Sequence, residues 1–184
     1  MRTRILLLGI LSLFFSFQAV NSQDKKAEAE EYGLKVGQKM PFHVVDFFAG
    51  AITKGSGCPS VMISNGEAQG VEIWSRTDDD QPFQLACALE AKLGDGKKKQ
   101  GYLILFKDTL KKAITEEPDA LKKVRVAVPR SSTKAMFDKA DASGKAGSVV
   151  FLLNRKEIIA VWTFAPGDLT KERIEAIVKQ FVKE

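Results

Sequence analysis

The sequence is poor in the residues that build metal centres and hydrolytic sites, because its 184 residues include one histidine and two cysteines. A zinc site of the Cys/His type needs four ligands, and the chain holds three such residues, so this class of site is excluded. The presence of one histidine alone also gives no support for a Ser-His-Asp hydrolase. No glycine-rich phosphate-binding pattern occurs, and we therefore predict neither a metal nor another cofactor.

A strong charge of one sign is also lacking, since 28 basic residues face 23 acidic ones and the formal charge is +5. Two of the basic residues, Arg2 and Arg4, lie in a segment without any acid. The basic clusters at Lys97–Lys99 and Lys122–Lys123 stand among acidic residues, and no aromatic side chains interleave with them for base stacking. This pattern is typical of a solvated surface, so nucleic acid is not expected as a partner.

No apolar run is long enough to span a membrane, because the longest, Ile5 to Phe17, is shorter than the roughly 20 residues that a spanning helix needs. Arg2 and Arg4 precede this run, and small residues follow it before Gln23. That plan predicts a secretory signal peptide over residues 1–22, with an uncleaved anchor as the alternative. We therefore expect an exported protein, periplasmic or extracellular, with no stable membrane insertion after cleavage.

Residues 23–31 are charged and have no apolar face, which predicts a tether. One domain is expected over 32–184, where short apolar runs alternate with amphipathic segments. The expected strands are 41–48, 71–74, 102–106, 124–128, 148–153 and 157–164, the last two joined as a hairpin. The expected helices are Pro82–Leu93, a segment around 117–123 and a short one over 133–140. A last, amphipathic helix is expected along the stripe Ile174, Ile177, Val178 and Phe181, with Asp168 or Thr170 as its cap. The glycine-rich segment 49–60 is expected to be a loop.

This order of elements predicts an α/β fold with a mixed sheet and helices on both faces, ending in a β-hairpin and a helix. Three stretches, Gly33–Phe42, Val71–Arg76 and Val149–Phe164 with the final helix, are similar to those of exported redoxin-type proteins. The chain thus resembles the thioredoxin-like fold family over about 33–184.

The resemblance implies an active site at the start of the helix after the central strand, where the family carries Cys-x-x-Cys and helix N–H groups stabilise a thiolate. Here the corresponding residues carry no sulfur: Thr77, Asp78, Asp79, Asp80, Gln81 and Pro82. The family also keeps a proline before the terminal hairpin, and Lys145–Ser148 contains none. The sequence therefore predicts a degenerate site. The three aspartates are interpreted as a helix cap, since the spacing of a calcium loop is absent.

Two cysteines remain outside that site, and the sequence leaves three interpretations of them open. Cys58 and Cys87 form a structural disulfide, or Cys87 is a buried apolar residue and Cys58 is idle, or Cys58 is reactive. Some exported redoxin-like proteins carry Cys-x-x-Cys near Cys58, but Val61 stands at the second position here. His43 is interpreted as an ordinary strand residue, with a base or a metal ligand as the alternative.

Two main functional hypotheses follow. The first is an exported binding or scaffold protein that has lost the dithiol site. The alternative is a thiol-dependent enzyme, a single-cysteine thiol-disulfide oxidoreductase or peroxidase acting through Cys58. The expected partner is an unidentified exported protein or thiol. A copper-handling role would need more soft ligands than Cys58, Cys87, His43 and Met40 or Met62 supply.

Overall fold

The computed structural model describes residues 34–94, 98–107, 111, 114–115, 118–141 and 144–183. The predicted signal peptide and tether lie outside these residues, as does part of the helix expected around 117–123. The described strands are β1 (Val45–Gly50), β2 (Ile52–Gly57), β3 (Gln69–Ser75), β4 (Lys99–Leu105), β5 (Arg125–Pro129), β6 (Ser148–Asn154) and β7 (Glu157–Phe164). The helices are α2 (Pro59–Asn65), α3 (Gln81–Glu90), α5 (Ser131–Ala140) and α6 (Lys171–Lys183), with a 3₁₀ turn η1 (Pro118–Ala120).

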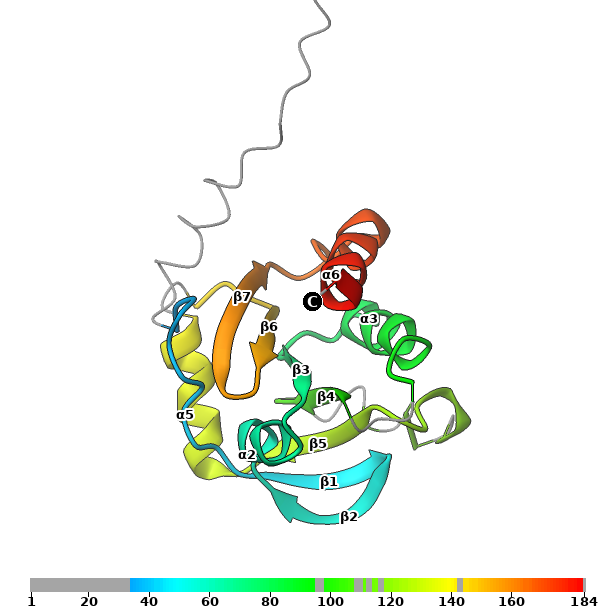
Figure 1. Ribbon diagram of the computed structural model, residues 1–184. Coiled ribbons are helices and arrows are strands. Elements are labelled where there is room, and N and C mark those ends of the chain that lie inside the picture. Colours follow the sequence, from blue (N-terminus) through cyan, green and yellow to red (C-terminus); the bar gives the residue numbers. More distant parts are fainter. Residues whose placement is uncertain are drawn as a thin grey trace, which may run out of the picture.

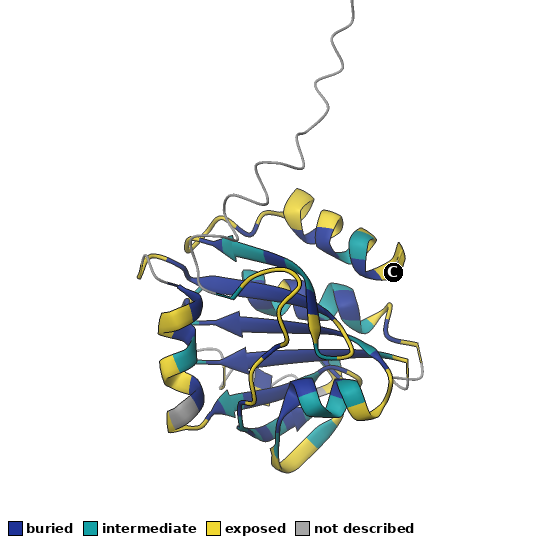
Figure 2. Ribbon diagram, turned by 60° about the vertical axis from the view of Figure 1, so that its left-hand side comes forward, coloured by how far each residue is buried: buried dark blue, intermediate teal, exposed yellow. Residues whose placement is uncertain are grey.

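One seven-stranded sheet organises the chain, in the order β2-β1-β5-β4-β3-β6-β7. Strands β3, β4 and β5 run parallel, while β1 and β6 flank them in the antiparallel direction. The central strands are buried on both faces, as their uninterrupted apolar runs predict (Figure 2). Because β3, β4 and β5 run in the same direction, their carboxyl ends lie on the same side of the sheet. The loops that follow β3 and β4 therefore meet there.

Each face of the sheet is covered by helices, which confirms the predicted layers (Figure 1). One apolar cluster packs α3 and α6 on one face, through residues such as Leu89 and Phe181. A second cluster lies on the opposite face and includes Ile63 of α2 and Phe137 of α5. In α6 the predicted stripe is confirmed, because Ile174, Ile177 and Phe181 are buried.

The prediction that residues 49–60 form a loop is wrong, since they contain the β1–β2 hairpin and the start of α2. Gly50 makes the tight turn possible: its φ is +80°, and a Cβ atom there would lie 1.8 Å from the carbonyl oxygen of Val124. β2 is an edge strand, which needs backbone pairing with β1 but few apolar side chains. β2 contains glycine, serine and threonine and has no apolar pattern, so the sequence did not predict it as a strand.

In its described part, residues 118–123, the helix expected around 117–123 is replaced by a 3₁₀ turn, Pro118–Ala120, and an irregular segment. The backbone N–H groups of Lys122, Lys123 and Val124 all donate to the carboxylate of Glu90, at 2.7–3.1 Å. Because these donors bind a side chain of α3, they are not available for helical hydrogen bonds.

Candidate functional site

A polar groove lies where the parallel strands end, beside the start of α3. Its cavity of about 500 Å³ is formed by the turn after β3, by Lys107 after β4, by the loop before β6 and by the turn after β7. The lining residues are Arg76, Thr77, Asp78, Asp79, Lys107, Gly144, Lys145, Ala146, Gly147, Pro166 and Gly167. Ligands of open α/β sheets bind at this edge, beyond the carboxyl ends of the strands.

Asp79 holds the groove together. Its carboxylate accepts hydrogen bonds from the Thr77 hydroxyl at 2.6 Å, the Gln81 N–H at 3.2 Å and the Gly167 N–H at 3.1 Å. The helix start predicted at the aspartate run is thus confirmed, and Asp79 rather than the N-cap residue Asp80 accepts the backbone hydrogen bond. This carboxylate places a negative charge at the start of α3 and ties α3 to the turn after β7.

Gln81 joins the same two segments a second time. Its side-chain amide donates to the Gly167 carbonyl at 3.0 Å, and its carbonyl oxygen accepts from the Leu169 N–H at 3.0 Å. Pro82 is buried in the first turn, where its missing N–H costs nothing. The start of α3 is therefore joined to the turn after β7 by side-chain hydrogen bonds from both Asp79 and Gln81.

Charged side chains of both signs stand around the groove. Lys107 pairs with Asp78 at 3.0 Å, and both side chains are about half exposed. Arg76 pairs with Asp138 at 2.5 Å and lies over the ring of Phe137, 4.1 Å from its centroid. These cations and carboxylates suit recognition of a charged ligand, and none of the lining residues is a cysteine or histidine.

The loop before β6 stands where the resemblance implies a proline. Here Gly147 accepts the Arg76 N–H at 2.7 Å through its carbonyl and donates its own N–H to Phe164 at 2.8 Å. A Cβ atom at Gly147 would lie 2.9 Å from the nitrogen of Pro166, so a larger residue would push the loop away. Glycine lets the two rims of the groove approach each other closely.

His43 belongs to a separate, buried cluster on the α2 face of the sheet. Its Nε2 lies 2.8 Å from Glu72, which also accepts the Trp74 indole N–H at 3.0 Å, and its Nδ1 lies 2.9 Å from the Pro41 carbonyl. Burial by itself lowers the pKa of His43, but Glu72 and the Pro41 carbonyl outweigh it and raise this pKa to about 9. His43 is therefore a charged partner of Glu72 at neutral pH.

Cys58 precedes α2 and touches this cluster from one side. Its Sγ accepts the backbone N–H of His43 at 3.4 Å and lies 3.3 Å from the Ser60 hydroxyl. The side chain is 6% exposed. Because both ring nitrogens of His43 face other groups, the imidazole is not positioned as a base for the thiol.

The two cysteines lie on opposite faces of the sheet. Cys87 packs with the α3–α6 cluster, whereas Cys58 contacts His43, whose ring packs 5.3 Å from that of Trp74 in the other cluster. Both are among the described residues, and no disulfide joins them. The structure thus describes two separate thiols, and the disulfide between them stays a prediction that a thiol count tests.

Two further findings concern the described part of the chain only. None of its helices is long and apolar enough to cross a membrane. No group of three or more histidine, cysteine and acidic residues converges there in a way that could hold a metal ion.

Sequence reasoning located the start of α3 but missed Lys107 and the turn at Pro166–Gly167, which approach the groove only through the topology of the sheet. It also missed Glu72, although a readable signal existed. A carboxylate between Val71 and Ile73, inside a strand buried on both faces, requires a charged or hydrogen-bonded partner.

The fold is shared with solved structures of thiol proteins. The chain matches a peroxiredoxin-like protein from Aquifex aeolicus with a TM-score of 0.55 and 14% identity, over 80% of this chain and 88% of that one. It matches reduced Prx3 from Vibrio vulnificus with a TM-score of 0.56 and 13% identity, over 80% and 98%. A thiol peroxidase from Chromobacterium violaceum gives a TM-score of 0.56 and 11% identity, over 82% and 87%.

No protein-family description matches the chain, and no curated protein matches it either. At these identities the structural likeness establishes the fold alone. The predicted fold is confirmed: the chain has a thioredoxin-like, redoxin-type fold with a mixed seven-stranded sheet.

Proposed function

We propose that this protein is an exported binding module that uses the groove at the start of α3 to recognise an extended polypeptide segment, without dithiol chemistry at that position. One observation carries the proposal: the carboxylate of Asp79, which accepts the Gln81 N–H, stands at the helix start where the resemblance implies a thiolate. A fixed negative charge at this point would also raise the pKa of any neighbouring thiol and so reduce its reactivity.

The chemistry of the groove supports a polypeptide as the ligand. Lys107 and Arg76 are held in exposed ion pairs, which contribute little to stability and open at low cost when a charged ligand arrives. Gly144 and Gly167 leave open space around their backbone, so a second backbone can come close on that side. A segment that carries both acidic and basic side chains complements these features.

The test is selection from a phage-displayed peptide library against the purified protein, followed by calorimetry with the enriched peptides. We expect peptides whose affinity falls about tenfold or more in Lys107→Glu, since charge reversal costs over 1 kcal/mol at a specific contact. Lys134→Glu, an exposed lysine on α5, is the matched control and should leave the affinity unchanged. Failure to enrich any peptide, or equal losses in both variants, contradicts the proposal.

Export is part of the same proposal, and it rests on the composition of residues 1–22. If the segment is a signal peptide, protein recovered from outside the cytoplasm of producing cells begins at Gln23. The intact mass of the recovered chain measures this directly. A chain that retains Arg2 and Arg4 and stays with the membrane fraction would instead support the anchor.

A single-cysteine oxidoreductase acting through Cys58 is the second candidate. The observation in its favour is that two donors, the His43 N–H and the Ser60 hydroxyl, lie near Sγ and would stabilise a thiolate. Peroxide consumption and disulfide reduction are measured for the protein, for Cys58→Ser and for Cys87→Ser as control. Turnover that disappears only in Cys58→Ser would establish this candidate and overturn the binding-module proposal.

A further inference from the structure

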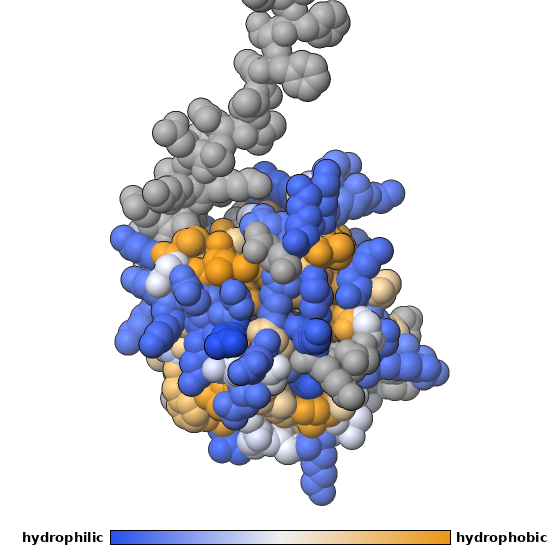
Figure 3. All heavy atoms as spheres, in the orientation of Figure 1, coloured by the Kyte–Doolittle hydropathy of each residue, from blue (hydrophilic) through white to orange (hydrophobic). Residues whose placement is uncertain are grey.

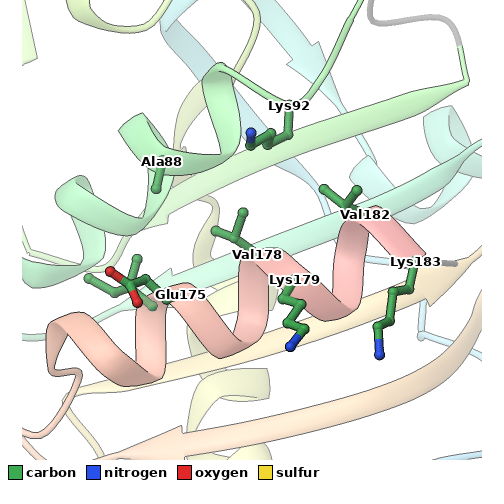
Figure 4. A pocket seen from close by; sticks show the side chains of 8 residues that line it. Ala88, Lys92, Glu175, Val178, Lys179, Val182 and Lys183 are labelled. Carbon is green, nitrogen blue, oxygen red and sulfur yellow. The ribbon is translucent and has the colours of Figure 1, made fainter.

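Two hollows of the described surface differ in character. Hydrophobic residues reach the surface beside α6 (Figure 3), where an apolar groove of about 440 Å³ lies between α3 and α6. Ala88, Val178 and Val182 border this groove, whereas Lys179 and Lys183 point away from α3 (Figure 4). The polar groove at the start of α3 is different, because charged side chains line it. Recognition of a charged ligand is therefore argued from the polar groove.

Arg76 of the polar groove is fixed at its backbone and at its guanidinium group. Its backbone N–H donates to the Gly147 carbonyl at 2.7 Å, which ties it to the loop before β6. Its guanidinium lies over the ring of Phe137, 4.1 Å from the ring centroid. Phe137 is buried and packs edge-on against Phe106, with 4.7 Å between the ring centroids. The guanidinium thus rests on a platform of close-packed rings.

The carboxylate that faces Arg76 is held less firmly. Asp138 pairs with Arg76 at 2.5 Å, but its side chain is 68% exposed, whereas that of Arg76 is 32% exposed. Exposed ion pairs contribute little to stability, because water solvates both charges and the side chains lose freedom. A carboxylate from outside can therefore replace Asp138, while stacking on Phe137 keeps the guanidinium in place.

The position of Arg76 selects an anion at this point of the groove. Arg76 lines the groove, whereas Asp138 does not. Asp79, which also lines the groove, already accepts hydrogen bonds from three donors and so does not compete for the guanidinium. A planar guanidinium offers parallel N–H donors that match the two oxygens of a carboxylate.

We infer that Arg76, supported by Phe137, anchors a carboxylate of the bound polypeptide, and that Asp138 takes this place in the free protein. The inference rests on the proposed function and names the ligand class within it: a segment with an acidic side chain or a free C-terminal carboxylate at this point. On binding, the hydrogen bonds of Arg76 pass from Asp138 to the ligand. The released Asp138 then pairs with a basic side chain of the same segment. Asp138 is thus a competitor of the ligand within the protein itself.

Calorimetry with a peptide enriched in the selection described above tests this assignment. Asp138→Asn should raise the affinity about two- to fivefold, which is the factor that corresponds to one exposed ion pair. Asp119→Asn is the matched control and should leave the affinity unchanged, since it removes the same charge from an exposed pair with Lys122 outside the groove. Arg76→Lys keeps the charge but loses the planar group, and should lower the affinity about fivefold or more.

The source of the carboxylate is found by preparing the peptide as the free acid, as the C-terminal amide, and with each acidic side chain changed to Asn or Gln. The effect of Arg76→Lys should disappear in the one form that lacks the anchoring carboxylate, which identifies it as terminal or as a side chain. The inference is overturned by equal effects of Asp138→Asn and Asp119→Asn, by unchanged affinity in Arg76→Lys, or by a loss that persists in every form. The proposed function survives these results if Lys107→Glu still weakens binding, whereas a selection that enriches no peptide overturns both.

Discussion

Because His43 and Glu72 form a buried pair, the stability of this protein should decrease as the pH rises above 6.5. Folding raises the pKa of His43 from 6.5 to about 9, so the pair contributes its full stabilisation below pH 6.5. The contribution is lost as the pH rises from 6.5 through 9, and its size is up to about 3 kcal/mol. Urea unfolding at a series of pH values should show the midpoint falling across this window.

Cys58 touches the same cluster through the backbone N–H of His43, so its contribution to stability must be separated from that of the imidazole. Cys58→Ser should keep most of the dependence on pH, and His43→Gln should remove most of it. If His43→Gln retains the wild-type slope, the imidazolium does not stabilise the fold.

Glu72→Gln tests the pair from the other side. Removing the carboxylate leaves burial as the main influence on the imidazole, so the pKa of His43 should fall below 6.5. The free energy of unfolding should fall by about 3–5 kcal/mol, because an ionised partner of a buried pair is lost. The chain has one histidine, so a single imidazole resonance reports the titration by NMR. A resonance that still titrates near 9 in Glu72→Gln would contradict the assigned cause.

Residue types alone pointed to the importance of Asp79, Cys58 and His43, but their roles depended on partners distant in sequence. His43 lies 29 positions before Glu72 and meets it only when β3 enters the sheet. The sequence alone therefore drew attention to His43, but it could not show whether this residue is a base, a metal ligand or an ion-pair partner.

Among the elements, the start of α3 depends on one carboxylate. Asp79→Ala leaves the Gln81 and Gly167 N–H groups and the Thr77 hydroxyl without their acceptor, and should reduce the free energy of unfolding by about 1–2 kcal/mol. The neighbouring Asp80 is exposed, and among the described residues its carboxylate accepts a hydrogen bond from the Gln84 side chain, so Asp80→Ala should change stability by less than about 0.5 kcal/mol. Equal effects of the two substitutions in urea unfolding would show that Asp79 has no special role.

The turn of the β1–β2 hairpin depends on Gly50. Alanine at this position must adopt a φ of +80° and also place its Cβ against the Val124 carbonyl, so Gly50→Ala should destabilise the protein by more than about 3 kcal/mol. Gly37 has a similar φ of +86° but open space around it, and Gly37→Ala should cost only about 1 kcal/mol. Thermal unfolding of both variants measures the difference, and equal losses would mean that the close contact is unimportant.

This hairpin also shows why the sequence predicted some elements and not others. Apolar runs identified β3, β6 and β7, and the spacing of apolar residues identified α6, because burial of these elements imposes a pattern on the side chains. An edge strand such as β2 is held by backbone pairing and imposes no such pattern. The 3₁₀ turn at Pro118–Ala120 was mistaken for a helix because its competing acceptor, Glu90, lies on another element.

At the scale of the whole molecule, the order of elements correctly predicted a mixed sheet with helices on both faces, and the resemblance pointed to the start of α3, beside which the polar groove lies. The remaining parts of the groove come from contacts across more than 80 positions, such as Gln81 with Gly167, which no local pattern encodes. The apolar groove between α3 and α6 likewise arises only when two amphipathic helices pack with a gap between them.

The sheet also separates the two sulfurs, and this leads to a prediction about the whole chain. Cys58 contacts the α2 side and Cys87 the α3–α6 side, so a disulfide between them would require the sheet to open. Alkylation under denaturing conditions without reductant should therefore label both cysteines, as measured by intact mass. Prior reduction should not increase the number of labels. A chain that takes up no label before reduction and two afterwards, while remaining monomeric, would show that the cysteines are bonded and that the two faces are not arranged as described.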